Sequence, residues 1–174
     1  MMRVTKCFTL ALSATFLISC KNRSRKIEDI DSYSLSIVDI SNYHSQRLDS
    51  SSKYEILVPN DFKIDKLSKP DFVHYSLCPI DTINKNYIIS GIQFGNHITD
   101  INPLFEAKLN KTKLVKGKLL DTDVKWKIYD YQNLVCGETA LSLNDSLKLH
   151  VYTYAKDYPH LDTLLNMLQS LKKH

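Results

Sequence analysis

The sequence predicts an α+β fold in which an antiparallel β-sheet carries one amphipathic helix. Several segments alternate apolar and polar residues with period two, which is the pattern of strands that are buried on one face. Short polar turns or single prolines end these segments. The last turns of the chain instead place leucines three and four residues apart, which is the spacing of a helix with one apolar face.

Six segments are expected to be strands, and two of them stop at a proline. The clearest alternation is Val124, Trp126 and Ile128, whose side chains should point to a core while the lysines between them point to water. The last three segments should form an antiparallel meander, because a short polar connection at 142–146 joins the final two. The expected strands are 54–58, 72–78, 87–94 (with Ile88, Ile92 and Phe94 on one face), 124–128, 134–141 and 147–154.

Two helices are expected. A short one should begin with Asn102 as N-cap and Pro103 at its first position, and end near Asn110. The C-terminal helix should pack on the sheet through a leucine stripe, with Pro159 in its first turn and Lys172 and Lys173 at its negative end. A helix lying on a membrane surface is disfavoured, because its polar face has few basic residues before Lys172. The stripe is Leu161, Leu164, Leu165, Leu168 and Leu171.

Two stretches resemble PsbP-like domains and related small bacterial lipoproteins. One is an early strand that runs into a proline turn at 54–62, and the other is a late strand with a terminal helix ending in Ser170-Leu171-Lys172. The usual aromatic residue after the proline turn is present here only as Phe62. The resemblance implies an antiparallel sheet with helices against it, an α/β/α sandwich. It brings no catalytic residues with it.

The N-terminal residues resemble a bacterial lipoprotein signal. Arg3 and Lys6 precede an apolar run of about 12 residues, which ends in Leu17-Ile18-Ser19-Cys20. The resemblance implies lipid on the Cys20 thiol and cleavage before it. A retained membrane span would need about 20 apolar residues, and an ordinary secretory signal cut near Ser19 is the other alternative. Two or more acyl chains make membrane attachment stable.

This interpretation divides the chain into a signal peptide at 1–19, a lipid-anchored flexible tether at 20–33 and one α+β domain at 34–174. No acidic residue follows Cys20, since Lys21 and Asn22 come next. In lipoproteins an Asp at that place favours retention in the inner membrane, so the expected location is the outer membrane, facing the periplasm.

Composition excludes some classes of partner. Without residues 1–19 the chain has 21 basic and 19 acidic residues, a net charge of +2 that is too small to argue for nucleic acid. Two cysteines besides Cys20 remain. A Cys78–Cys136 disulfide would close a long loop and add about 4 kcal/mol of stability, whereas two buried free thiols are the alternative.

No catalytic or metal-binding motif occurs in the sequence. The six histidines are scattered, and there is no His-x-x-x-His, Cys-x-x-Cys or Gly-x-Ser-x-Gly pattern. We therefore expect no catalytic residue, metal or cofactor. Tyrosines could line an interface, although tyrosines more often flank a sheet core. They are Tyr129, Tyr131, Tyr152, Tyr154 and Tyr158.

These observations predict a non-catalytic, lipid-anchored envelope domain that binds another protein. A narrower form of this hypothesis is an immunity-type inhibitor that neutralises a toxin in the periplasm. Two other classes stay open. One is a small thiol hydrolase that uses Cys136 or Cys78 as nucleophile. The other is a carrier that holds a small apolar molecule between the sheet and the helix.

Overall fold

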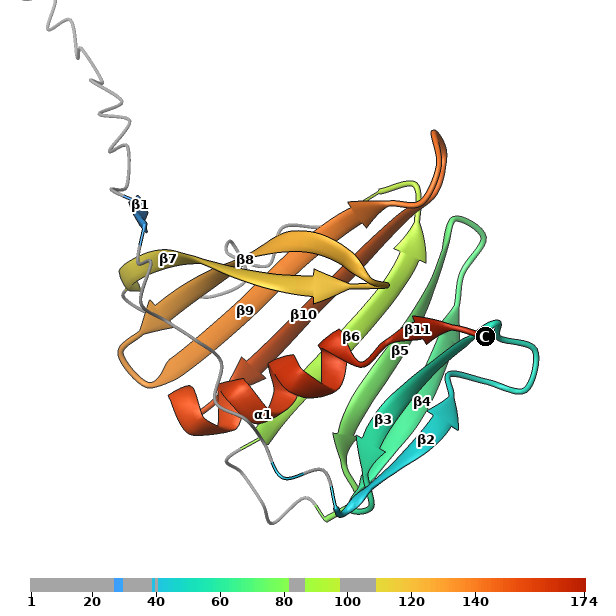
Figure 1. Ribbon diagram of the computed structural model, residues 1–174, viewed down its shortest axis with the longest axis horizontal. Helices are drawn as coiled ribbons and strands as arrows, with labels where there is room; N and C mark the ends of the chain where they lie inside the picture. The colour runs from blue at the N-terminus through green and yellow to red at the C-terminus, as the bar shows by residue number, and fades with distance from the viewer. Residues whose placement is uncertain (1–26, 30–38, 40, 82–86, 98–108) are drawn as a thin grey trace, which may run out of the picture.

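The computed structural model describes residues 27–29, 39, 41–81, 87–97 and 109–174 of the 174-residue chain. Within these residues, eleven strands form two sheets and one helix lies against them (Figure 1). The fold is therefore mostly antiparallel β-sheet with one C-terminal helix, and the predicted α+β class is confirmed at this level.

The larger sheet has eight strands, and the smaller has three. All neighbouring strands are antiparallel except β1 and β7, which are parallel. The order in the larger sheet is β1 (Ile27–Asp29), β7 (Leu109–Leu119), β8 (Thr122–Tyr131), β9 (Leu134–Ser142), β10 (Lys148–Ala155), β6 (Tyr87–Gly95), β5 (Phe72–Pro79) and β4 (Phe62–Ser68). The smaller sheet has the order β11 (Lys172–Lys173), β3 (Tyr54–Pro59) and β2 (Tyr43–Arg47).

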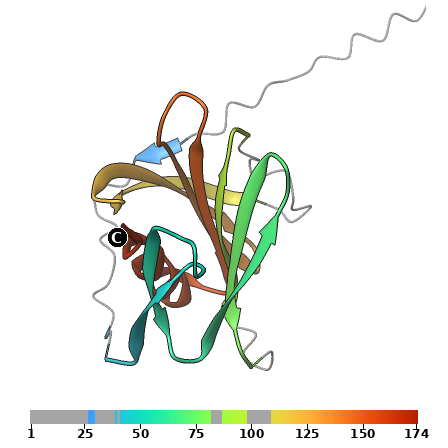
Figure 2. The same cartoon turned by 90° about the vertical axis from the view of Figure 1, so that its right-hand side faces the viewer.

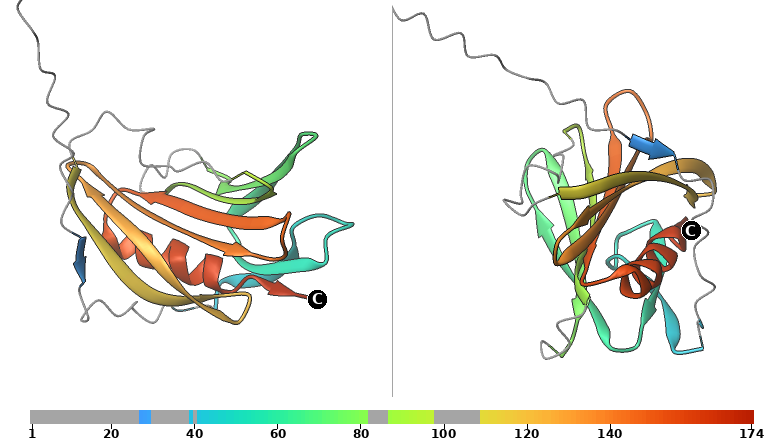
Figure 3. Two further views of the ribbon diagram at one scale, coloured as in Figure 1. Left: turned by 90° about the horizontal axis from the view of Figure 1, so that it is seen from above. Right: turned by 90° about the vertical axis from the view of Figure 1, so that its left-hand side faces the viewer.

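Helix α1 (Tyr158–Gln169) lies in the hollow that the two sheets leave between them. Figures 2 and 3 show the larger sheet curling around the helix, with β7 and β8 on one side of it and the smaller sheet on another. We call the face of the larger sheet that meets α1 the helix face; it carries Trp126, Ile128, Leu149 and Val151, all buried. The opposite face is the outer face. Because strand side chains alternate, it carries Lys127, Glu138, His150 and Tyr152 at the intervening positions.

The predicted strands and the C-terminal helix are confirmed. Strands β8, β9 and β10 form the antiparallel meander, and Trp126 and Ile128 are fully buried. Asp157 caps α1, since its side chain accepts a hydrogen bond from the His160 backbone N–H. The leucine stripe is almost wholly buried against the sheets. The α1 helix has 12 residues, and no helix among the described residues is long and apolar enough to cross a membrane.

Three expectations about local structure were wrong in whole or in part, or lie mostly outside the described residues. Lys172 and Lys173 do not end the helix but form β11, where Lys172 Nζ lies 2.7 Å from the Glu55 carboxylate on β3. Most of the helix expected at 102–110 lies outside the described residues, and its last two positions belong to strand β7. Residues 27–29, within the expected tether, form β1 beside β7.

Candidate functional site

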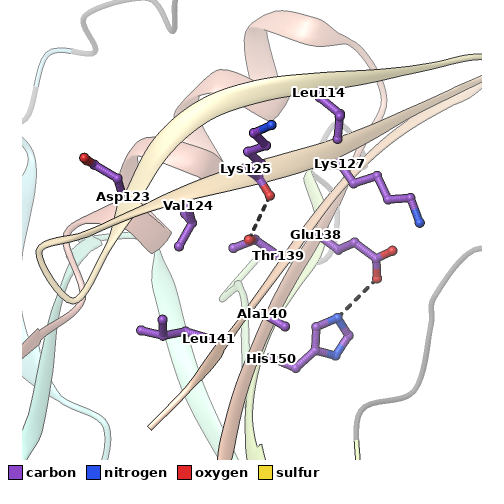
Figure 4. Close-up of a pocket in the computed structure, with 10 residues that line it drawn as sticks. All are labelled: Leu114, Asp123, Val124, Lys125, Lys127, Glu138, Thr139, Ala140, Leu141 and His150. Carbon is purple, nitrogen blue, oxygen red and sulfur yellow. Dashed lines mark hydrogen bonds and ion pairs between the residues drawn. The ribbon is translucent and has the colours of Figure 1, made fainter. Parts of the chain in front are cut away.

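A pocket of about 580 Å³ is lined by residues of β7, β8, β9 and β10 (Figure 4): most belong to the outer face, and Val124, Thr139 and Leu141 belong to the helix face, where the pairing of β8 with β9 has ended. Charged side chains and apolar side chains both contribute to its walls. We call it the outer-face pocket. Its lining consists of Leu114, Asp123, Val124, Lys125, Lys127, Glu138, Thr139, Ala140, Leu141 and His150.

Glu138 and His150 form a buried acid–histidine pair at one end of this pocket. Glu138 Oε2 lies 3.2 Å from His150 Nε2, and Glu138 Oε1 accepts a 2.7 Å hydrogen bond from the Tyr129 hydroxyl. His150 is only 2% exposed and Glu138 only 7%. Because Nε2 faces a carboxylate, it is the nitrogen that carries the proton in neutral His150. The other ring nitrogen, Nδ1, is buried and has no hydrogen-bond partner.

Four lysines gather on the outer face of the β7–β8 hairpin. Lys116 and Lys125 are directly opposite each other in the ladder, an arrangement of like charges that is destabilising. Lys118 and Lys127 occupy the diagonal positions on the same face. No carboxylate among the described residues lies within ion-pair distance of any of the four. Asp123 is directly opposite Lys118 and Glu138 is directly opposite Lys127, so the excess positive charge beside the pocket is centred on Lys116 and Lys125.

A second polar pair lies next to the pocket, on β5 and β10. His74 Nε2 is 2.9 Å from the Tyr152 hydroxyl, and the two rings are stacked. Burial, and in second place the nearby His150, lower the pKa of His74. The Tyr152 ring lies across Gly91 on β6, where any Cβ atom would be 2.3 Å from ring carbon Cζ. A glycine at position 91 is thus what allows Tyr152 to reach His74.

The sequence left open whether five tyrosines line an interface or flank a core, and most of them belong to a second core. Tyr129, Tyr131 and Tyr154 are buried together with Cys136 on the outer face, and Tyr152 packs against them. Tyr158, at the start of α1, donates a 2.8 Å hydrogen bond to Asp130. The interface interpretation is therefore wrong for the three buried rings, because they do not reach the surface.

The two cysteines of the domain are free thiols, and the disulfide left open by the sequence is not formed. Cys136 is on β9 and Cys78 on β5, with β10 and β6 between them. Three strand spacings amount to about 14 Å, whereas bridged Cα atoms lie about 4.4–6.8 Å apart. Burial raises the pKa of Cys136 to about 12 and also raises that of Cys78. Cys20, the predicted lipid site, lies outside the described residues.

The histidines remain dispersed except for His74 and His150. Within the part of the chain that the structure describes, no group of three or more His, Cys, Asp or Glu side chains could hold a metal ion. No protein-family model matches the chain, and no curated protein matches it. The outer-face pocket therefore has to be interpreted from its own chemistry.

Sequence reasoning missed the pocket and its acid–histidine pair. Glu138 is directly opposite Tyr152 in the β9–β10 ladder, so Glu138 and His150 meet as diagonal neighbours. The available signal was a polar residue at each intervening position of two predicted adjacent strands. This signal pairs Glu138 with His150 only if the register of β9 against β10 is known, and the sequence does not provide that register.

Proposed function

We propose that this protein is a lipid-anchored, non-catalytic domain of the bacterial cell envelope that binds another protein at the outer-face pocket. The observation that carries the proposal is the pocket itself, in which lysines without an ion-pair partner stand beside the buried Glu138–His150 pair. A pocket of this size, with apolar walls and a few polar groups, has the build of a binding site.

Anchoring through lipid on Cys20 belongs to the same proposal, with the domain on the outer membrane facing the periplasm. The finer architecture that we propose is PsbP-like; the antiparallel sheet with a terminal helix supports it. An immunity protein against a periplasmic toxin is the narrower form of the function, in which the toxin would be the partner.

The thiol chemistry supports binding over hydrolysis. A cysteine nucleophile acts as the thiolate, and activated cysteines have lowered pKa values. Both domain thiols have raised pKa values instead. The carrier hypothesis needs space between sheet and helix. There, a Cβ at Gly137 would already lie 3.1 Å from Leu165, so the two layers are in close contact at that point.

Site-specific photo-crosslinking in intact envelopes tests the partner. A photoreactive residue replaces Ala140, which is exposed and lines the pocket, and the matched control places it at exposed Lys69 in the β4–β5 turn. We expect a reproducible adduct with one envelope protein from position 140 and none from position 69. Absence of an adduct at 140, or equal adducts at both positions, would contradict binding at this pocket.

The anchor is tested by Cys20→Ala. Without the thiol that carries the lipid, the protein should keep its signal peptide and lose the fatty modification, and metabolic labelling with radioactive palmitate should detect label only in the unsubstituted protein. Label on the Cys20→Ala protein would show that the anchor lies elsewhere.

A further inference from the structure

We infer that the outer-face pocket receives one extended strand of the partner protein, which pairs through its main chain with the free edge of β9 at Ala140 and Ser142. This inference rests on the proposed function and specifies how the partner is bound. Its basis is a split in the larger sheet. Strands β8 and β9 stop pairing at Lys127 and Glu138, although both strands continue beyond that pair, and the pocket lies at the split (Figure 4).

The register shows which way the main-chain groups of β8 point at the split. If the β8–β9 ladder continued, Lys125 would be directly opposite Ala140. The Lys125 carbonyl does face β9, but there it accepts a 2.9 Å hydrogen bond from the Thr139 hydroxyl instead of a backbone N–H. A side chain therefore takes the place of the missing ladder bond at this position.

The corresponding groups of β9 are left without a partner. In an antiparallel ladder the N–H and C=O of one residue point to the same neighbouring strand, and this direction alternates along the strand. Because Lys125 faces β9, Ala140 and Ser142 must face β8, where the pairing has ended. Throughout the described ranges, the main-chain N–H and C=O of these two residues form no hydrogen bond outside the sheets. We call these groups the free β9 edge.

Contacts with helix α1 keep the split open. The Lys118 backbone N–H on β7 donates a 2.8 Å hydrogen bond to Gln169 Oε1 at the end of α1. Gly117 permits this approach, since a Cβ there would lie 2.6 Å from the same oxygen. The tip of the β7–β8 hairpin thus bends over the helix (Figure 3). The split is therefore fixed by the packing of the hairpin on α1.

The free β9 edge suits strand addition better than the outermost strand of the same sheet. Beyond Glu138, β9 continues as Thr-Ala-Leu-Ser, with no charged residue and no proline. Strand β4 instead exposes Lys63, Asp65 and Lys66, and charges of this kind protect an edge from pairing with another chain. Unpaired N–H and C=O groups at strand spacing are complementary to a polypeptide main chain, which is how added strands gain their affinity.

The side chains beside the split indicate what the added strand carries. Its side chains would alternate between the two faces of the sheet. Those on the helix face would meet Val124 and Leu141, which pack on the core and remain partly exposed. Apolar side chains fit there, because same-face neighbours on adjacent strands are in contact. The partner's segment should therefore be extended, with apolar residues at alternate positions.

Hydrogen exchange followed by NMR tests whether the edge is free. The probe is the ¹⁵N-labelled, lipidated chain in nanodiscs of phosphatidylcholine. The Ala140 N–H should exchange at least about tenfold faster than the Leu141 N–H, because the latter faces Leu149 on β10. Equal protection of the two would overturn the inference, since the β8–β9 ladder would then be closed.

Photo-crosslinking in intact envelopes tests the pairing itself. A photoreactive residue replaces Lys125, which lines the pocket, in combination with Ala140→Pro or Ala140→Val. Proline removes an N–H that is unbonded within the protein, so urea unfolding should show that the fold persists. Valine has a similar size and keeps the N–H. The adduct should decrease at least about tenfold with proline and persist with valine.

A second variant and three outcomes make this test decisive. Ser142→Pro, which removes the other free N–H nearer to the end of β9, should act like Ala140→Pro. Equal adducts with proline and valine would overturn the inference while leaving the proposed function standing. An adduct between two copies of this chain would also overturn it, because the strand would then come from a second copy. No adduct from position 125 or from position 140 would contradict the proposed function as well.

Discussion

Gly91 is a position where a single added methyl group should destabilise the fold through one identifiable contact, with the Tyr152 ring. In Gly91→Ala the new Cβ would lie 2.3 Å from Tyr152 Cζ and 2.6 Å from its hydroxyl. Ordinary contact begins at 3.4 Å, so the ring has to retreat by about 1 Å or more. The retreat would break the 2.9 Å bond to His74 and move Tyr152 off its preferred rotamer.

The magnitude follows from three contributions. Losing the Tyr152–His74 hydrogen bond costs about 1 kcal/mol, and an off-rotamer ring costs about 0.5–1.5 kcal/mol. Replacing glycine by alanine inside a strand returns about 0.5–1 kcal/mol. We therefore expect Gly91→Ala to lower the free energy of unfolding by roughly 0.5–2 kcal/mol. In a Tyr152→Ala background the ring is gone, and the same substitution should stabilise by about 0.5–1 kcal/mol.

Urea unfolding followed by tryptophan fluorescence measures both effects. Trp126 is the single tryptophan of the chain and is fully buried, so its emission should change on unfolding. Tyr152→Phe separates the cost of the lost hydrogen bond from the cost of the clash, because it removes the hydroxyl but keeps the ring carbon that meets the new Cβ. An equal cost of Gly91→Ala with and without the Tyr152 ring would refute the reasoning, since the penalty would then come from the backbone of β6.

Three further outcomes are expected. Glu138→Ala removes the acceptor of the Tyr129 and His150 hydrogen bonds, so urea unfolding should show a loss of about 2–4 kcal/mol, with Glu138→Gln losing less because it keeps one acceptor oxygen and the side-chain volume; equal losses would contradict this expectation and mean that the second carboxylate oxygen or its charge carries the whole effect. The pKa of His74 is lowered by burial, so the unfolded chain takes up that proton first as the pH falls. The free energy of unfolding should therefore decrease below about pH 6.5, by at most ~1.4 kcal/mol per pH unit; His74→Gln should flatten that decrease, and an unaltered pH dependence would contradict the assignment. Both free cysteines of the domain should react with a thiol reagent in urea without prior reduction, and a need for reductant would show that they are bonded.

The elements that could be predicted from the sequence are those with one apolar face. Val124, Trp126 and Ile128 mark β8 because lysines separate them, and the leucine stripe marks α1 in the same way. The antiparallel meander followed from the short connections between its strands. These signals are local, and tertiary contacts only reinforced them.

Strand β7 was not predicted because neither of its faces is apolar throughout. Its helix face holds Lys113 next to Val115, and the Lys113 ammonium lies 4.5 Å above the Tyr158 ring. A buried lysine compensated by an aromatic ring 45 residues away leaves no periodic trace in the sequence. The prediction that Lys172 lies at the end of the helix was wrong for a related reason. A basic residue after a helix suits the helix dipole, but here the contact with Glu55 on β3 decides its place.

The site was out of reach for sequence reasoning because it depends on register and curvature. The Glu138–His150 pair needs β9 and β10 aligned so that Glu138 is opposite Tyr152. The lysine cluster needs the β7–β8 register that sets Lys116 against Lys125. A slip of one residue in either ladder would move these side chains to the other face.

The parallel pairing of β1 with β7 limits how far the domain can travel. Ile27 is held beside Thr112, and only seven residue steps separate Ile27 from Cys20. A fully stretched chain covers roughly 24 Å over that length. With the anchor proposed above, Ile27 stays within roughly 24 Å of the lipid-bearing residue, so the domain is confined to a thin layer next to the membrane. Confinement of that kind raises the effective concentration of a partner held in the same membrane, so even a weak contact could be occupied most of the time.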